Sequence, residues 1–312
     1  HGTNPASVAM CGFETREVPS TPDGDVDMEK LRSMVDGNVA AMMLTSPNTL
    51  GLFDRNIAGI ARVLHEKGAL FYCDGANLNA VLGVAKVREM GFDLMHINLH
   101  KTFSTPHGGG GPGSGPLGVS DELEPFLPVP VVLKGKKGLY LEYDRPDSIG
   151  RIHSFYGNFL IALRAYVYIR TLGPDGIRDV GETAVLNANY LMSLLRKEYN
   201  LPVDRICKHE FVLNDKDMPN GVTTNDIAKR ILDYGFHAPT VYFPLLIPGA
   251  IMIEPTETET RETLEAFAGA MTAIKREAES DPETVKSAPH TTPVRKVDAV
   301  LAARRPVLKW EP

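Results

Sequence analysis

Apolar runs and helical repeats alternate over the first hundred residues of the chain. The runs VAAMMLT at 39–45, ALFYCD at 69–74 and DLMHINL at 93–99 lack the strict alternation of half-exposed strands, which is typical of parallel strands buried on both faces. Residues 54–68 repeat apolar side chains at helical spacing and end at a glycine. This order predicts an α/β fold, with right-handed crossovers, a mostly parallel sheet and flanking helices.

Three shorter elements are predicted before the first of these strands. An Asn-Pro pair, with Asn4 as the cap, favours a helix over 5–11. The alternating FETREVP favours a strand over 13–19, and an aspartate cap favours a helix over 27–35. The sequence opens without an initiator methionine or a leader, so we expect a fragment whose upstream part is missing.

The pattern of predicted elements changes in the second half of the chain and suggests a second domain. Beyond residue 116 short strands with many prolines and glycines lead to two long helices. These helices are predicted at 157–172 and 175–199, and strand and helix then alternate again at 209–214, 224–234, 250–255 and 258–279. We therefore expect a large domain over 1–200, a small α+β domain over 201–280 and an extended tail over 281–312.

Composition and charge narrow the class of protein. The chain has 312 residues, of which 43% are hydrophobic and 23% charged, so it is large enough for one sizeable core and a smaller domain. No apolar run approaches the roughly 20 residues that a bilayer span needs. The net charge of −6 argues against binding to nucleic acid or to a membrane surface. Three cysteines without CxxC spacing fit a reducing compartment, and we expect the cytoplasm.

Polar residues follow three of the predicted strands at the point where each ends. They are SPNT at 46–49, DGAN at 74–77 and HKT at 100–102. Because the carboxyl ends of parallel strands meet at one edge of a sheet, ligands bind there. Taken singly, Asp74 is more often a helix cap or turn former, and Lys101 is usually a solvated charge.

Together, Asp74 and Lys101 are the pair that pyridoxal 5'-phosphate requires from a protein. The lysine amine binds the cofactor covalently and later yields it to a substrate amine. The carboxylate keeps the pyridine nitrogen protonated, so that the ring can stabilise negative charge on the substrate. Ala76 is then expected against the ring face, although alone it fits a small core residue equally well. For His100, packing beneath the sheet edge and contact with the cofactor are equally open.

The tract TFSTPHGGGGPGSGP at 102–116 follows Lys101 directly. Its glycines permit a close approach of a ligand or another chain segment, although a flexible surface loop is the plain alternative. The tract satisfies G-x-G-x-x-G, but it does not directly follow a strand and prolines interrupt any helix after it, so we reject a dinucleotide site. His107, His153 and His237 lack metal-ligand spacing, and we expect no metal. No Ser-His-Asp or G-x-S-x-G arrangement supports a hydrolase.

Several longer motifs closely resemble one family, the glycine decarboxylase P-protein. The motifs are HGTNPAS at 1–7, TSPNTLGLFD at 45–54, YCDGANLNA at 72–80, NLHKTFSTPHGGGGPGSGPLG at 98–118, ETAVLNANY at 182–190, DYGFHAPTVYFP at 233–244 and IEPTET at 253–258. The resemblance covers nearly the whole chain, and SFYGNF at 154–159 is more similar to subunit 2 of the split bacterial and archaeal form.

The resemblance implies a fold type I pyridoxal-phosphate enzyme and assigns roles to particular residues. It makes Lys101 the catalytic, cofactor-bearing lysine, Asp74 the partner of the ring nitrogen and Ala76 the ring-face residue. Thr3, Asn4, Ser46 and Asn48 fall in segments that border the cofactor. Asn48 is expected to donate to the cofactor phenolate oxygen, with an Asx-type turn as the structural alternative. The phosphate-binding loop of the family lies upstream of this chain.

The activity implied is that of glycine dehydrogenase (aminomethyl-transferring), an oxidoreductase of the glycine cleavage system. It decarboxylates glycine and passes the aminomethyl group to the lipoyl arm of the H-protein. The expected partners are glycine, the lipoylated H-protein, P-protein subunit 1 and a second copy, in a heterotetramer. Two alternatives stay open: another fold type I enzyme, such as an aminotransferase or a cysteine desulfurase, and a cofactor-free scaffold subunit.

Overall fold

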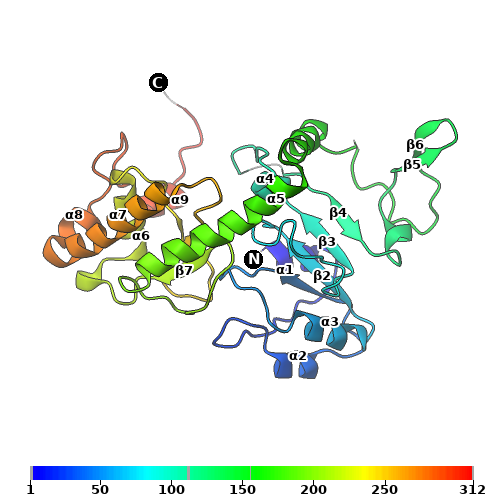
Figure 1. Cartoon of the computed structure of the whole chain (residues 1–312), viewed down its shortest axis with the longest axis horizontal. Helices are drawn as coiled ribbons and strands as arrows, with labels where there is room; N and C mark the ends of the chain where they lie inside the picture. Colours follow the sequence, from blue (N-terminus) through cyan, green and yellow to red (C-terminus); the bar gives the residue numbers. More distant parts are fainter. Residues whose placement is uncertain (1–2, 111–112, 155, 311–312) are drawn as a thin grey trace. The chain divides into compact units, whose positions relative to one another are not determined.

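The computed structural model describes residues 3–110, 113–154 and 156–310, which form two compact units (Figure 1). The first unit comprises the chain up to residue 185 together with 205–209, and the second comprises 186–204 and the residues from 210 onward. The chain passes from one to the other within the long helix α5 (Phe159–Leu195). The domain boundary expected near residue 200 stays a prediction.

A four-stranded sheet forms the centre of the first unit. Its order is β1 (Ala41–Thr45), β2 (Leu70–Gly75), β3 (Leu94–Ile97) and β4 (Leu117–Val119). The first three strands are parallel, and β4 joins the edge antiparallel to β3. The predicted α/β fold with a mostly parallel sheet is confirmed.

Helices α2 (Met28–Met34) and α3 (Ile57–His65) supply the core on one face of this sheet (Figure 1). Leu31, Ile60 and Leu64 are fully buried there together with Phe71 of β2. The helical spacing of these apolar residues gives each helix one buried stripe, which packs against the apolar strands. The predicted helices and strands of this region are therefore confirmed. The expected burial holds for β2 alone, because the residues of β1 and β3 are partly exposed.

A second apolar cluster lies under the short helix α4 (Leu99–Thr102), where the first half of α5 packs. The helix α5 is two helices in succession, because Gly173 has φ 66° and ψ −177° and is followed by Pro174. Such dihedral angles are almost confined to glycine, and proline cannot continue the hydrogen-bond ladder behind it. The two long helices predicted on either side of this point are confirmed.

The remaining elements of the first unit include one wrong prediction. Helix α1 (Thr3–Met10) is present as expected. The strand predicted over 13–19 is wrong, because these residues are nearly all exposed and the nearest pairing is a single bridge between Ser20 and Val26. Alternation alone forms no strand without a neighbouring strand to bond to. The other elements are the 3-10 helix η1 (Glu124–Phe126) and a hairpin of β5 (Val131–Gly135) and β6 (Gly138–Glu142).

The second unit packs helices on a small antiparallel sheet. The sheet order is β7 (Phe211–Asn214), β9 (Ala250–Ile253) and β8 (Thr240–Val241). The other elements are α6 (Thr224–Asp233), α7 (Arg261–Ser280) and the 3-10 helix η2 (Pro219–Gly221). This is the α+β alternation that the sequence predicts after residue 209.

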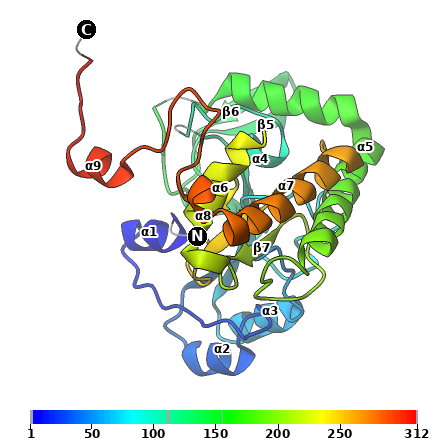
Figure 2. The ribbon, with the colours of Figure 1, turned by 90° about the vertical axis from the view of Figure 1, so that its left-hand side faces the viewer.

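The segment from residue 281 contains two short helices, α8 (Pro282–Lys286) and α9 (Ala299–Arg304), so it is not extended throughout (Figure 2). Between them the chain is held by hydrogen bonds to the carboxylate of Asp233 from the backbone of His290 and Thr291. Among the helices that the structure describes, none is both apolar and long enough to span a membrane.

Candidate functional site at the carboxyl edge of the sheet

Three polar residues form a row across the ends of the parallel strands. Thr45 of β1 is in register with Asp74 of β2, and Asp74 is in register with His96 of β3. Residues paired in this way point to the same face of a sheet. The Thr45 hydroxyl donates to Asp74 Oδ2 at 3.0 Å, and His96 Nε2 lies 3.2 Å from Asp74 Oδ1.

The carboxylate of Asp74 is buried and accepts hydrogen bonds at both oxygens. Besides the Thr45 and His96 contacts, Asn4 Nδ2 donates to Oδ2 at 2.9 Å, and the backbone N–H of Ala76 donates to Oδ1 at 2.9 Å. Burial by itself would raise the pKa of Asp74, but the hydrogen bonds from His96, Asn4 and Thr45 outweigh it and hold the pKa well below its usual range. Asp74 is therefore a fixed negative charge at this edge.

Helix α4 positions Lys101 just beyond the end of β3. Leu99 and Phe103 anchor this helix in the apolar cluster, and Thr102 Oγ1 accepts from the backbone N–H of Leu78 at 3.0 Å, in the loop that follows β2. Lys101 itself is exposed. His100 and Lys101 both lie in this single helical turn.

His100 packs against His107, with 3.8 Å between the ring centroids. The Nδ1 atoms of both rings are buried, and neither has a hydrogen-bond partner within the described chain. Burial, the neighbouring His107 and the charge of Lys101 all lower the pKa of His100. His100, with its neutral ring, thus lies next to Lys101 in α4. Contact of His100 with a cofactor stays a prediction.

A histidine that sequence reasoning missed also lies near Lys101. His209, in the short segment 205–209 that returns to the first unit, is almost completely buried. Burial, with a smaller effect of the Lys101 charge, lowers the pKa of His209 to about 4. No strand-end pattern marks this residue, because it is brought here from more than a hundred residues away.

Ser46 and Asn48 lie in the loop after β1 and differ in how their side chains are used. Ser46 is buried, and its hydroxyl has no partner within the described chain. Asn48 Oδ1 accepts from the backbone of Leu50 and Leu52, while its amide donates to the carbonyl oxygen of Gly24. The Asx-type turn is therefore present at Asn48, and a role for Asn48 toward the cofactor stays a prediction, as it does for Thr3, Ser46 and Ala76.

Two family models match most of the chain. One, described as "Glycine dehydrogenase, C-terminal domain", covers residues 180–296, and the other, "Aminotransferase class-V", covers residues 3–119. The chain is 56% identical over 311 residues to "Probable glycine dehydrogenase (decarboxylating) subunit 2" of Caldanaerobacter subterraneus subsp. tengcongensis. It is 59% identical over 312 residues to the protein of the same description in Bacillus velezensis. Over its whole length the chain is thus similar to proteins described as glycine dehydrogenase (decarboxylating) subunit 2.

The alignments cover nearly all of this chain but only part of each relative. The alignments cover 99% and 100% of this chain but 64% of each of these two relatives. The chain thus spans 64% of the length of these relatives, slightly less than two thirds.

Solved structures show the fold. A crystal structure of glycine decarboxylase (P-protein) in inhibitor-bound form superposes with a TM-score of 0.73 at 22% identity, covering 87% of this chain and 62% of that one. A cysteine desulfurase from Thermococcus onnurineus NA1 superposes with a TM-score of 0.66 at 17% identity, covering 86% and 68%. The fold is that of fold type I pyridoxal-phosphate enzymes, as predicted.

The glycine tract after Lys101 has a structural reason. The backbone N–H of Leu99 donates to the carbonyl of Ser114, and that of Ile97 donates to the carbonyl of Pro116. The tract thus runs back along the end of β3, and a Cβ atom at Gly115 would overlap the carbonyl oxygen of Ile97. The close approach expected from these glycines is made by the chain itself; Gly111 and Pro112 lie outside the described residues.

The residues of this edge fit pyridoxal phosphate. An ionised buried carboxylate, an exposed lysine amine and the unpartnered hydroxyl of Ser46 provide the charges and donors that a cationic ring, an aldehyde and an oxygen-rich ligand require. Because a carboxylate has about four lone-pair sites, a ring N–H must share an oxygen with one of the four present donors or displace it. Asn4 is the donor most easily displaced, since no residue of α1 is buried.

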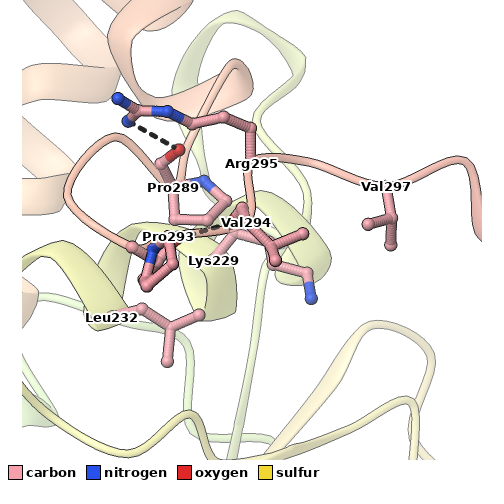
Figure 3. Close-up of a pocket in the computed structure, with 8 residues that line it drawn as sticks. Lys229, Leu232, Pro289, Pro293, Val294, Arg295 and Val297 are labelled. Atoms are coloured by element: carbon pink, nitrogen blue, oxygen red, sulfur yellow. Dashed lines mark hydrogen bonds between the residues drawn. The ribbon is translucent and has the colours of Figure 1, made fainter. Parts of the chain in front are cut away.

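A separate pocket lies within the second unit (Figure 3). Lys229 and Leu232 of α6 form one wall, and Pro289 and Val294 of the C-terminal segment form the other. Arg295 bonds to the carbonyl of Pro289 there instead of reaching into the pocket (Figure 3). The lining residues include Lys229 but no carboxylate, so this pocket lacks the lysine–carboxylate pair that a pyridoxal-phosphate site needs.

Proposed function

We propose that this chain carries the cofactor-binding lysine of a glycine dehydrogenase (decarboxylating). The proposed activity is the decarboxylation of glycine with transfer of the aminomethyl group to the lipoyl arm of the H-protein. The observation that carries the proposal is the carboxylate of Asp74, which is buried and ionised at the same sheet edge from which α4 presents Lys101. Such a pair is characteristic of a site for a pyridinium ring tethered to a lysine.

Each residue of the edge has a defined task in this proposal. When bound, pyridoxal phosphate draws electrons from the bonds of the glycine α-carbon, which is the chemistry that lets carbon dioxide leave. Lys101 would hold the cofactor through a covalent bond to Nζ, and the amine freed when glycine takes its place would accept the proton that the glycine ammonium group loses. Asp74 accepts the ring N–H and keeps that proton in place. The walls of the site are proposed to include Thr3, Asn4, Ser46, Asn48, Ala76 and His100.

The description of the relatives as a subunit 2 supports a subunit 1 as one partner. The other proposed partners come with the proposed activity: glycine, the lipoylated H-protein and a second copy of each chain in a heterotetramer. The proposed location is the cytoplasm. The excess of acidic residues supports small molecules and proteins, rather than nucleic acid, as partners.

Replacing Lys101 tests the proposal directly. In the full-length protein assembled with its partner subunit, Lys101→Ala should abolish borohydride trapping of pyridoxal phosphate on the chain. It should also reduce exchange of carbon dioxide with the glycine carboxylate by several orders of magnitude. The reason is that the lysine amine serves both as the covalent anchor of the cofactor and as a proton acceptor, and the substitution removes it. Trapping is measured by mass spectrometry of the reduced peptide, and exchange by incorporation of labelled bicarbonate.

Lys86→Ala is the matched control. Lys86 is a surface lysine of the same unit that pairs with Glu89, and its removal should leave both readouts unchanged. Normal exchange in Lys101→Ala would contradict the proposal. Amino transfer to a keto acid by the unmodified enzyme, without glycine exchange, would instead favour an aminotransferase.

A further inference from the structure

Asp74 is the first of three polar side chains that contact one another in a row on one face of the sheet. Tyr72 and Asp74 are two residues apart on β2 and therefore point to the same face. His96, which pairs with Asp74 across the strands, has its two ring nitrogens near the two β2 side chains. Nε2 lies 3.2 Å from Asp74 Oδ1, and Nδ1 lies 3.0 Å from the Tyr72 hydroxyl. The imidazole thus bridges the phenol and the carboxylate.

The order of donors along this chain follows from the charge of Asp74. An ionised carboxylate can only accept, so the Nε2 of His96 must carry a hydrogen and donate it. In the neutral ring the Nδ1 then accepts, and the Tyr72 phenol donates to it. Burial, followed by the negative charge of Asp74, raises the pKa of Tyr72, which keeps the phenol protonated as this order requires. The histidine–carboxylate contact has the form in which a second partner fixes the ring's tautomer.

The two oxygens of Asp74 are held in different ways. Oδ2 takes its hydrogen bonds from the hydroxyl of Thr45 and from Asn4 in the exposed helix α1. Oδ1 takes its bonds from the backbone of Ala76 and from His96. A ring N–H that displaces Asn4 leaves the Oδ1 side intact, so His96 retains its hold on the carboxylate when a ligand arrives.

We propose that His96, oriented by Tyr72, is a positioning residue that fixes the Asp74 carboxylate in the rotamer that meets the cofactor's ring nitrogen. This inference rests on the proposed function of the same edge. His96 touches neither the reacting atoms nor Lys101 in this assignment. It acts through Asp74, and Tyr72 acts through His96.

The test uses the assembled full-length enzyme and pyridoxal 5'-phosphate labelled with ¹⁵N in its ring. Two quantities are measured: the dissociation constant of the cofactor, and the ¹⁵N chemical shift of the bound ring, which reports whether the nitrogen is protonated. His96→Leu should raise the dissociation constant about tenfold, since a hydrogen bond to a charged group is lost, and should move the shift toward that of the unprotonated ring. Tyr72→Phe, which keeps the ring shape, should change both in the same direction by a smaller factor of about three.

A conservative variant and a matched control separate positioning from general damage. His96→Gln, whose amide can still donate to Asp74, should recover most of the protonated shift. His65→Leu should change neither quantity, because His65 pairs with Asp93 at 2.9 Å in the same unit and does not contact Asp74. If His96→Leu does not fold, Tyr72→Phe and His96→Gln decide the matter.

The outcomes distinguish this inference from the proposed function. If the unmodified enzyme takes up no cofactor that borohydride reduces onto Lys101, the proposed function fails and the inference with it. If the unmodified enzyme binds the cofactor, but His96→Leu and Tyr72→Phe leave both quantities unchanged, the inference alone is overturned. The same holds if His65→Leu produces the same shift as His96→Leu.

Discussion

Buried titratable side chains in this chain differ in charge, because their neighbours differ. Asp74 and His209 are both buried, yet Asp74 is kept charged by hydrogen bonds, whereas His209 is kept neutral by burial and by a neighbouring positive charge. The cysteines differ in the same way. Cys73 precedes Asp74 on β2 but points to the opposite face, into the core between the sheet and α3. Its position beside the site therefore confers no reactivity.

The thiols should differ sharply in their reaction with a disulfide reagent. Burial, with the negative charge of Asp74, raises the pKa of Cys73 to about 12, so roughly one thiol in ten thousand is ionised at pH 8. Cys11 is exposed, whereas Cys73 and Cys207 are buried. One rapidly reacting thiol per folded chain is expected by absorbance, and Cys11→Ser should remove it. Three equally fast thiols in the folded protein would contradict this picture.

Glycines at the element scale either break a helix or weaken one. Gly173 separates the two halves of α5 with a backbone conformation that other residues avoid, and space around it is open. Gly269 lies inside α7 in regular helical conformation, also with open space around it. The same substitution should therefore have opposite effects at the two sites, for reasons of backbone conformation rather than packing.

Alanine at the two glycines tests this difference in conformation. Gly173→Ala should lower the free energy of unfolding by about 2 kcal/mol, because the backbone there is almost exclusive to glycine. Gly269→Ala should raise it by about 0.5 to 1 kcal/mol, since alanine has the better helix propensity and restricts the unfolded chain. Denaturant titrations followed by circular dichroism measure both. A loss of stability at both sites would show that packing, and not backbone conformation, decides.

At the scale of the whole molecule, a buried carboxylate ties together segments 180 residues apart. Asp25 accepts from Arg55 Nε at 2.6 Å and from Arg205 Nη1 at 3.1 Å. Arg205 also donates to the carbonyl of Asp23, and the backbone of Lys208 donates to Gly51. These bonds hold segment 205–209 in the first unit, and so they hold His209 near Lys101.

Removing the charge of Asp25 should weaken the first unit. Burial would raise the pKa of Asp25, but the bonds from Arg55 and Arg205 lower it below its usual value, so its stabilising effect is present above about pH 4 and is lost as the pH falls through the folded pKa. At neutral pH, Asp25→Asn should lower the free energy of unfolding by about 3 kcal/mol, because it removes the buried charge to which Arg55 and Arg205 both bond. The measurement is the denaturant midpoint at pH 7 and at pH 3, where the difference from the unmodified chain should shrink.

Asp23→Asn is the control for that experiment. Asp23 bonds to the same Arg55, but both side chains are largely exposed, and exposed ion pairs contribute little to stability. Its midpoint should stay close to that of the unmodified chain. Equal losses for Asp23→Asn and Asp25→Asn would contradict the role assigned to burial.

The sequence by itself determined the parallel strands and the edge at which the proposed site lies. Apolar runs mark β1, β2 and β3 because side chains of all three strands pack into the apolar core, and the polar residues after them lie at one edge since the strands are parallel. Asp74 and Lys101 follow from that rule alone. The strand expected over 13–19 fails because a strand needs a partner, which no local pattern records.

Only the tertiary structure decided what surrounds those residues. His96 lies within a strand and Tyr72 before the end of another, so neither stands at a strand end where chemistry is expected. The contacts of His96 with Asp74 and with Tyr72 depend on strand register, which is set by pairing across the sheet. His209 approaches Lys101 because Arg205 is held by Asp25. Contacts of this range depend on how distant segments pack, and that is information that neighbouring residues do not contain.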